Sequence, residues 1–149
     1  MDIWDEIAAE AAGESDLWAR ALLPGHERQL VAVFSPLAAA RFALGLETIY
    51  EAYLVHFGKP RLFEPPDRDT ALLLGDYLYA HGLVRIAETG DVAAVAALSE
   101  LISTCARLRA EGLDGDGDAW VETTRRLDGA AADTDAVERA LAAHRRRLG

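Results

Sequence analysis

The sequence predicts an all-α protein, built as an orthogonal or antiparallel helix bundle. Three observations lead to this class. Half of the residues (51%) are hydrophobic, mostly Ala and Leu, and β-branched residues are few. The five prolines lie between the periodic runs. Residues 71–112 join a nearly all-apolar helix to an amphipathic helix through a Gly-Asp turn.

The first predicted helical segment covers residues 2–23. Its apolar residues recur in a helical pattern that is broken at 13–15, where Ser15 or Asp16 can cap a second segment. Pro24 and the glycine after it end the segment.

A second helix is predicted to begin at Ser35. Ser35 is a favourable N-cap, and Pro36 suits the first helical position. Apolar residues then recur at offsets of three and four, whereas Glu47, Thr48 and Glu51 take the other side. We therefore expect this helix to bury one face.

A proline-containing loop, 58–67, precedes the next helix, which Asp69 can cap and which runs to about Thr89. This helix has so little polar surface that a central position or a subunit interface would have to cover it. Gly75 and Gly82 each cost about 1 kcal/mol relative to Ala inside a helix. We expect the close approach of a neighbouring backbone to compensate for them.

The last third of the chain predicts three more helices. Gly90 and Asp91 are typical of a C-terminal cap followed by an N-cap, so the next helix pairs antiparallel with the previous one. Two helices are predicted at 120–127 and 135–148, with a small-residue linker at 129–132.

The acidic run 114–118 is similar at its start to a calcium-binding loop. The spacing then fails, because Ala119 stands where the turn glycine belongs and Arg125 stands where the bidentate Glu belongs. We therefore interpret the run as an acidic turn that caps the next helix.

Length and composition limit the functional classes. A chain of 149 residues can bury roughly 68–70% of its unfolded surface, which predicts one domain, 1–149. The net charge of −10 disfavours binding to nucleic acid, and the basic run 145–147 is explained by favourable charge at a helix C-terminus. Cys105, the single cysteine, lies on an apolar stripe typical of the core. The absence of a leader and of a long apolar run predicts a cytoplasmic protein without a membrane span.

Over roughly residues 24–149, several motifs in order resemble the N-terminal half of the isoprenoid synthase fold, as found in the trans-polyprenyl diphosphate synthase family. LLLGDYLYAHG (72–82) is followed by ETGD and by a long helix closing in AEG. LETIY (46–50) and then LVH (54–56) look like the family's helix that ends in a histidine, and GKP (58–60) looks like the loop after it. In the family, an all-helical bundle holds Mg²⁺ on two aspartate-rich motifs and condenses an allylic diphosphate with isopentenyl diphosphate.

The chain departs from the family at the positions that perform catalysis. His56 is followed by residues 57–60 where DDxxD is expected, and no second aspartate-rich motif follows 142–149. The Gly-Lys-Arg motif is replaced at 25–27 by Gly-His-Glu, whose carboxylate would repel a diphosphate, and 122–127 lacks the family's Lys-Thr pair. Mg²⁺ needs clustered carboxylates. We assign no catalytic residue and no metal ligand, and expect no bound cofactor, with Mg²⁺ only on a catalytic partner.

The resemblance implies a non-catalytic accessory subunit of a heteromeric polyprenyl diphosphate synthase, similar to the small component of two-component hexaprenyl or heptaprenyl synthases. It would act in isoprenoid or quinone side-chain biosynthesis by docking on a catalytic subunit, as a heterodimer or heterotetramer, and tuning it. In the family, the counterparts of helices 69–89 and 91–111 form the subunit interface. The residues expected at this interface are Leu74, Tyr77, Leu78, His81, Leu98 and Ile102, although core packing explains them about as well. The expected wall of a product groove is formed by Tyr50, Tyr53 and Leu54.

Two other functions stay open. One is a stand-alone helical homodimer that acts as a scaffold or binds an apolar ligand. The other is an enzyme with unrelated chemistry, which requires a nucleophile–base pair or a metal constellation. The four histidines lie on different predicted elements, so a structural role is expected for each.

Overall fold

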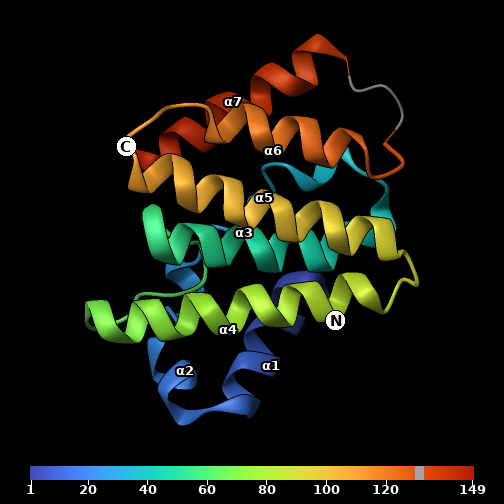
Figure 1. The fold of residues 1–149 in the computed structure, drawn as a ribbon. Coiled ribbons are helices and arrows are strands. Elements are labelled where there is room, and N and C mark those ends of the chain that lie inside the picture. The colour runs from blue at the N-terminus through green and yellow to red at the C-terminus, as the bar shows by residue number, and fades with distance from the viewer. Residues whose placement is uncertain (130–132) are drawn as a thin grey trace.

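The computed structural model describes residues 1–129 and 133–149 (Figure 1). This part of the chain forms seven α-helices and three short 3₁₀ turns, with one isolated antiparallel bridge between Leu22 and Phe63 and no strand. The predicted all-α class is confirmed. The α-helices are α1 (Ile3–Glu14), α2 (Asp16–Ala21), α3 (Ala43–Phe57), α4 (Arg68–Ala87), α5 (Val92–Ala110), α6 (Asp116–Arg125) and α7 (Thr134–Leu148). The 3₁₀ turns are η1 (Gly25–Glu27), η2 (Ser35–Leu37) and η3 (Ala40–Phe42).

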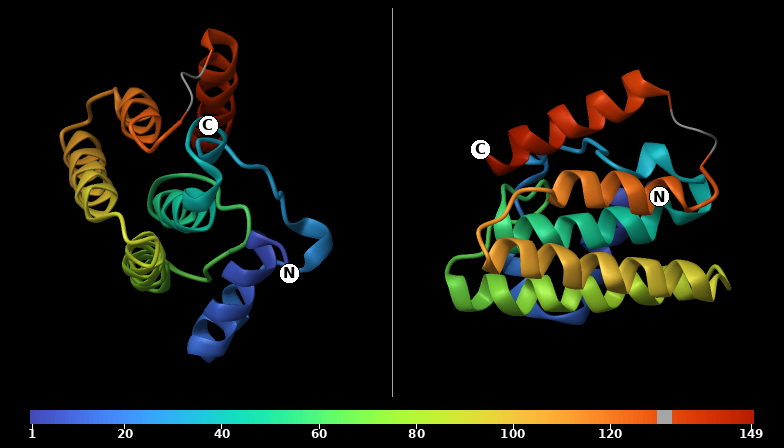
Figure 2. Two further views of the ribbon diagram at one scale, coloured as in Figure 1. Left: turned by 90° about the vertical axis from the view of Figure 1, so that its right-hand side faces the viewer. Right: turned by 45° about the horizontal axis from the view of Figure 1, so that its top comes forward.

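Helix α3 lies in the centre of the bundle. Figure 2 shows α4, α5, α6 and α7 arranged in chain order around it, with α1 on the remaining side. Every residue of α3 from Gly45 to Val55 is buried, including Glu47, Thr48 and Glu51. The expectation of a single buried face was therefore wrong. The two glutamates are accommodated because they pair with a buried arginine, described below, and the Thr48 hydroxyl donates to the Leu44 carbonyl at 2.7 Å.

The start of α3 also differs from the prediction. Ser35 does not cap a long helix: it begins the short turn η2, the backbone is extended at Ala38, and α3 begins only at Ala43. Tertiary contacts override the local signal here, because the Ala39 N–H donates to the carbonyl oxygen of Leu127 at 3.0 Å. This path also places the Phe34 side chain in the core.

Helix caps were predicted more successfully. Ser15 accepts a hydrogen bond from the Leu17 N–H at the start of α2, and Asp91 caps α5 in the same way after Gly90, which has a φ of 82°. The N-cap of α4 is Asp67 rather than Asp69, two residues earlier than predicted. The predicted linker 129–132 lies outside the described residues except for Gly129.

The closest helix contact joins α3 to α4 through glycines. A Cβ added to Gly82 would lie 3.1 Å from the Ile49 nitrogen and 3.2 Å from the Gly45 oxygen, so the two backbones touch. This confirms the close approach expected for Gly82. At Gly75, the missing side chain makes room for the ring of His56 instead. No helix in the described part of the chain is long and apolar enough to cross a membrane.

Candidate functional site

A fully buried arginine fixes the loop that follows α3. The Arg61 Nε donates to Glu51 Oε1 at 3.0 Å, and its Nη1 donates to Glu47 Oε2 at 3.0 Å. Burial opposes the guanidinium charge, but the two carboxylates outweigh it and hold the pKa of Arg61 above its ordinary value. Arg61 Nη1 also donates to the Val31 carbonyl at 2.9 Å. The triad therefore fastens two irregular segments, one before and one after α3, to the central helix.

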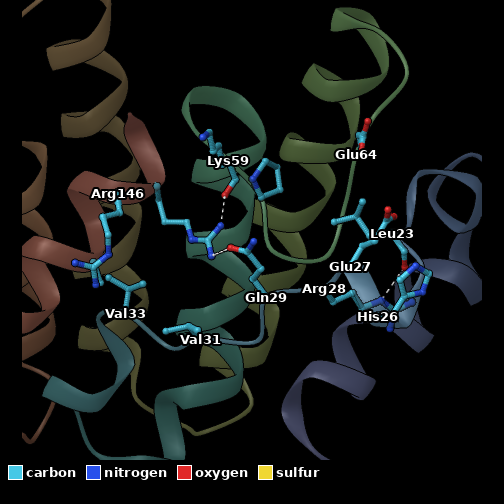
Figure 3. Close-up of a pocket in the computed structure, with 13 residues that line it drawn as sticks. Leu23, His26, Glu27, Arg28, Gln29, Val31, Val33, Lys59, Glu64 and Arg146 are labelled. Carbon is cyan, nitrogen blue, oxygen red and sulfur yellow. Dashed lines mark hydrogen bonds between the residues drawn. The ribbon is translucent and has the colours of Figure 1, made fainter.

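These segments and the end of α7 enclose a cavity of about 740 Å³ (Figure 3). The residues that line the cavity come from three segments far apart in the sequence, 23–33, 59–64 and 143–147. Four permanent cations line it, Arg28, Lys59, Arg146 and Arg147, against two carboxylates, Glu27 and Glu64. In a chain of net charge −10, this is a local excess of positive charge that favours an anion.

Two of the cations hold the cavity together. Arg28 Nε donates to the Leu23 carbonyl at 2.9 Å, and Arg147 Nη2 donates to the Gln29 side chain. The Lys59 N–H in turn donates to the Arg147 carbonyl at 2.8 Å. Burial lowers the pKa of Arg147, and the charge of Arg61 lowers it further. The Arg147 guanidinium is thus repelled by a nearby positive charge, and a bound anion would reduce this repulsion.

The other two cations are available to a ligand. Among residues 1–129 and 133–149, neither Lys59 nor Arg146 has a carboxylate within ion-pair distance. Figure 3 shows Glu27 and Glu64 on the opposite side of the cavity from Lys59 and Arg146. The Glu27 carboxylate was expected to repel a diphosphate. In the structure this repulsion acts only at one side of a cavity whose charge is mainly positive. This cavity could not be predicted from the sequence, because Lys59 and Arg146 are far apart along the chain and line the same space only after folding.

A second polar cluster positions α7. The His144 Nε2 lies 3.0 Å from Asp116 Oδ2, and the Tyr50 hydroxyl lies 2.7 Å from His144 Nδ1. Because an ionised carboxylate only accepts, His144 Nε2 carries a proton and donates to Asp116. The same carboxylate accepts from the Tyr53 hydroxyl and from Arg109 Nη2 at 3.2 Å. The cluster joins α3, α5, α6 and α7, and so fixes the helix that carries Arg146 and Arg147.

The charge of Asp116 is strongly stabilised in this cluster. Burial raises the pKa of Asp116, but hydrogen bonds from His144 and Tyr53 and the positive charge of Arg109 outweigh it, so the pKa lies below its ordinary value. The acidic turn therefore differs from the prediction. The N-cap of α6 is Gly115, with a φ of 115° and no side-chain cap, and Asp116 turns into the core instead.

The predicted product-groove residues lie in the interior. Tyr50, Tyr53 and Leu54 are at most 1% exposed and pack in the larger core cluster with Trp120. The cavity at the end of α3 is lined by other residues. Both tyrosine hydroxyls are engaged in the Asp116 cluster, so their first role is structural.

The predicted partner-contact residues divide into two groups. Leu74, Leu78 and Leu98 are buried in the chain's own core at 0–1% exposure, so they offer no surface to a partner. Tyr77, His81 and Ile102 are half-buried. Tyr77 stacks on His81 with ring centroids 5.4 Å apart, and His81 also bonds to Glu10 of α1.

The apolar residues that α4 exposes are not the ones predicted to contact a partner. Leu73 is 58% exposed and Val84 is 51% exposed, and Ala80 and Ala87 are exposed as well. These four residues lie at offsets of 7, 11 and 14 from Leu73, which places them on one side of the helix. We call Leu73, Ala80, Val84 and Ala87 the outward face of α4.

Neither a reactive cysteine nor a metal site is found among the described residues. Burial raises the pKa of the Cys105 thiol to about 12, so it remains protonated at neutral pH and is a poor nucleophile. In the part of the chain that the structure describes, no three or more His, Cys, Asp or Glu side chains gather as a metal site would require. No family model, curated protein or solved structure matches this chain.

Proposed function

We propose that this chain is a non-catalytic accessory subunit of a heteromeric polyprenyl diphosphate synthase, which docks on a catalytic subunit and tunes it. The observation that carries the proposal is the outward face of α4. Leu73 and Ala80 of this face lie in the segment 72–82, whose sequence most resembles the family, and Leu73 is exposed beside the buried Leu74.

The outward face has the dimensions of a docking surface. At 1.5 Å per residue, the 20 residues of α4 span about 30 Å. A stable interface buries about 800 Å² on each partner, so docking through this face would also have to cover residues of the antiparallel neighbour α5. Interface centres are depleted in charge. The four residues of the outward face are apolar, and the exposed Asp76, three residues after Leu73, is the charged residue on the same side of the helix.

The end of α3 supports a role without catalysis. Mg²⁺ takes oxygen ligands and needs carboxylates to hold it against a diphosphate. Here α3 ends at Phe57 and is followed by residues 58–60, and Lys59 places a positive charge in the adjoining cavity. Such a field disfavours a divalent cation and favours an anion.

A homodimer formed through the same face is the second candidate function. An apolar helix face can be covered by a second copy of the chain as well as by a different subunit, because a two-fold interface uses one patch twice. Such a homodimer would act as a scaffold or bind an apolar ligand. Measuring the mass of the chain alone separates this candidate from an obligate accessory subunit.

Co-expression with a synthase that carries both aspartate motifs, from the same genome, tests the docking proposal. We expect the two chains to purify together, and Leu73→Glu to abolish this because it places a charge in an apolar contact. Leu113→Glu is the matched control, since Leu113 is 51% exposed and lies outside α4. Equal loss of the partner in both variants, or retention in both, would contradict docking through this face.

A further inference from the structure

A small pocket lies between the end of α3 and the start of α4, which are found at the same end of the bundle (Figure 1). Its volume is about 280 Å³, and it shares no lining residue with the cationic cavity or with the outward face of α4. The pocket is lined by Val55, His56 and Phe57 of α3 and by Arg68, Ala71 and Leu72 of α4.

The walls of this pocket are mainly apolar and include two fixed rings. Leu72 is 46% exposed, which leaves apolar surface for a ligand to cover. The His56 Nε2 donates to the Leu72 carbonyl at 3.2 Å, because a carbonyl only accepts, and this bond fixes the imidazole ring. The ring packs edge-on against Phe57, with centroids 5.7 Å apart. Such rings favour edge-to-face contact with a further aromatic ring.

The size of the pocket limits the ligand to a small molecule. An apolar cavity of about 150 Å³ is large enough to hold benzene. A pocket of about 280 Å³ therefore has room for one aromatic ring and a short substituent.

Arg68 gives the pocket its positive charge. It is exposed, and within the described residues it has no carboxylate at ion-pair distance. Arg68 is also the first residue of α4, where the positive end of the helix dipole repels a cation. A carboxylate bound to the guanidinium through two hydrogen bonds would offset this repulsion.

Acidic residues near the pocket limit the charge of the ligand. Asp67 and Asp69 adjoin Arg68 in the sequence, and Asp76 Oδ1 lies 3.7 Å from His56 Nε2. These three carboxylates would repel a doubly charged phosphate more strongly than a singly charged carboxylate. An uncharged aromatic compound, in turn, would leave Arg68 without a partner.

We propose that this pocket binds one small aromatic monocarboxylate. The aromatic ring lies against the walls formed by the end of α3 and the start of α4, and the carboxylate pairs with Arg68. The site uses none of the four residues of the outward face, and its test needs no partner subunit.

Titration of phenylacetate into the purified chain, followed by ¹H–¹⁵N nuclear magnetic resonance, tests the proposal. We expect saturable shifts of the backbone amides of residues 55–57 and 68–72. The affinity measured from these shifts should be at least about tenfold higher than for acetate, benzyl alcohol or phenyl phosphate. Equal affinity for any of these three compounds, or no shift at these residues, would overturn the proposal.

Two variants locate the ligand. Arg68→Gln should weaken phenylacetate binding about tenfold, and Leu72→Gln should weaken it at least about threefold. The matched controls are Arg20→Gln and Leu113→Gln, because both positions are exposed and lie outside the pocket. The spectrum of each variant also shows whether it is folded. Unchanged binding by folded Arg68→Gln, or equal weakening in the controls, would contradict the proposed site.

Discussion

At the scale of single residues, two buried ionic clusters hold irregular segments in place. Arg61 fastens the loop after α3, and Asp116 gathers donors from three other helices. Buried charges destabilise a fold unless they are paired, so each cluster depends on all of its members. The loss of unfolding free energy when one member is replaced therefore tests whether each cluster stabilises the fold.

Replacing Arg61 by Ala should destabilise the chain by about 3–5 kcal/mol, because Glu47 and Glu51 would be left buried without their partner. Urea unfolding followed by circular dichroism measures this loss. Arg107→Ala is the control, since its ion pair with Glu111 is exposed and is worth at most about 0.5 kcal/mol. Similar losses in the two variants would contradict the buried triad.

Replacing Asp116 by Asn should destabilise the chain by about 2 kcal/mol at pH 7, because charged hydrogen bonds to His144 and Arg109 are lost. The pKa of Asp116 is lowered in the folded state, so its contribution is present above an unfolded pKa of about 3.9 and is lost as the pH falls below it. The difference in unfolding free energy between the two proteins should therefore shrink below about pH 4.

The control for this prediction is Asp118→Asn. Asp118 lies in the same first turn of α6 but is exposed, so it shares the helix-dipole term and lacks the buried partners. A pH-independent effect of Asp116→Asn, or an equal effect of Asp118→Asn, would show that the cluster does not stabilise the fold.

At the scale of elements, the crossing of α3 and α4 sets the architecture. Gly82→Ala should destabilise the chain by about 1–3 kcal/mol, since its Cβ would press on Ile49 and on the Gly45 backbone. Gly13→Ala on α1 has open space around it and should instead stabilise the helix by up to about 1 kcal/mol. Thermal unfolding measures the change in stability of each variant, which should be a loss for Gly82→Ala and a gain for Gly13→Ala. A stabilising Gly82→Ala would contradict the close crossing.

Local signals in the sequence predicted the elements better than their positions in the bundle. The caps Ser15 and Asp91 depend on side chains a few residues away, so their pattern is visible in the sequence. The complete burial of α3 depends on Arg61, which neutralises Glu47 and Glu51 from another segment. Periodicity alone treats those carboxylates as an exposed face.

The same reasoning explains the displaced face of α4. An almost wholly apolar helix has no polar side to orient it, so the sequence could not distinguish Leu74, which is buried, from Leu73, which is exposed. The choice depends on the contact of Gly75 and Gly82 with α3, which fixes the rotation of the helix.

At the scale of the whole molecule, the candidate sites lie on different surfaces. The outward face of α4 belongs to one side of the bundle, and the cationic cavity lies where segments before and after α3 meet the end of α7. The cavity could not be predicted from the sequence, because more than a hundred residues separate Arg28 from Arg146. Docking and ligand binding can therefore be tested separately.

A prenyl chain-growth assay tests whether this chain is a non-catalytic subunit that tunes a catalytic partner. It supplies Mg²⁺, an allylic diphosphate and isopentenyl diphosphate to the isolated chain, to the catalytic partner, and to both together. We expect no product from the isolated chain and, from the mixture, a rate or product length that differs from that of the partner alone. Product formed by the isolated chain, or a mixture that behaves as the partner does alone, would contradict this proposal.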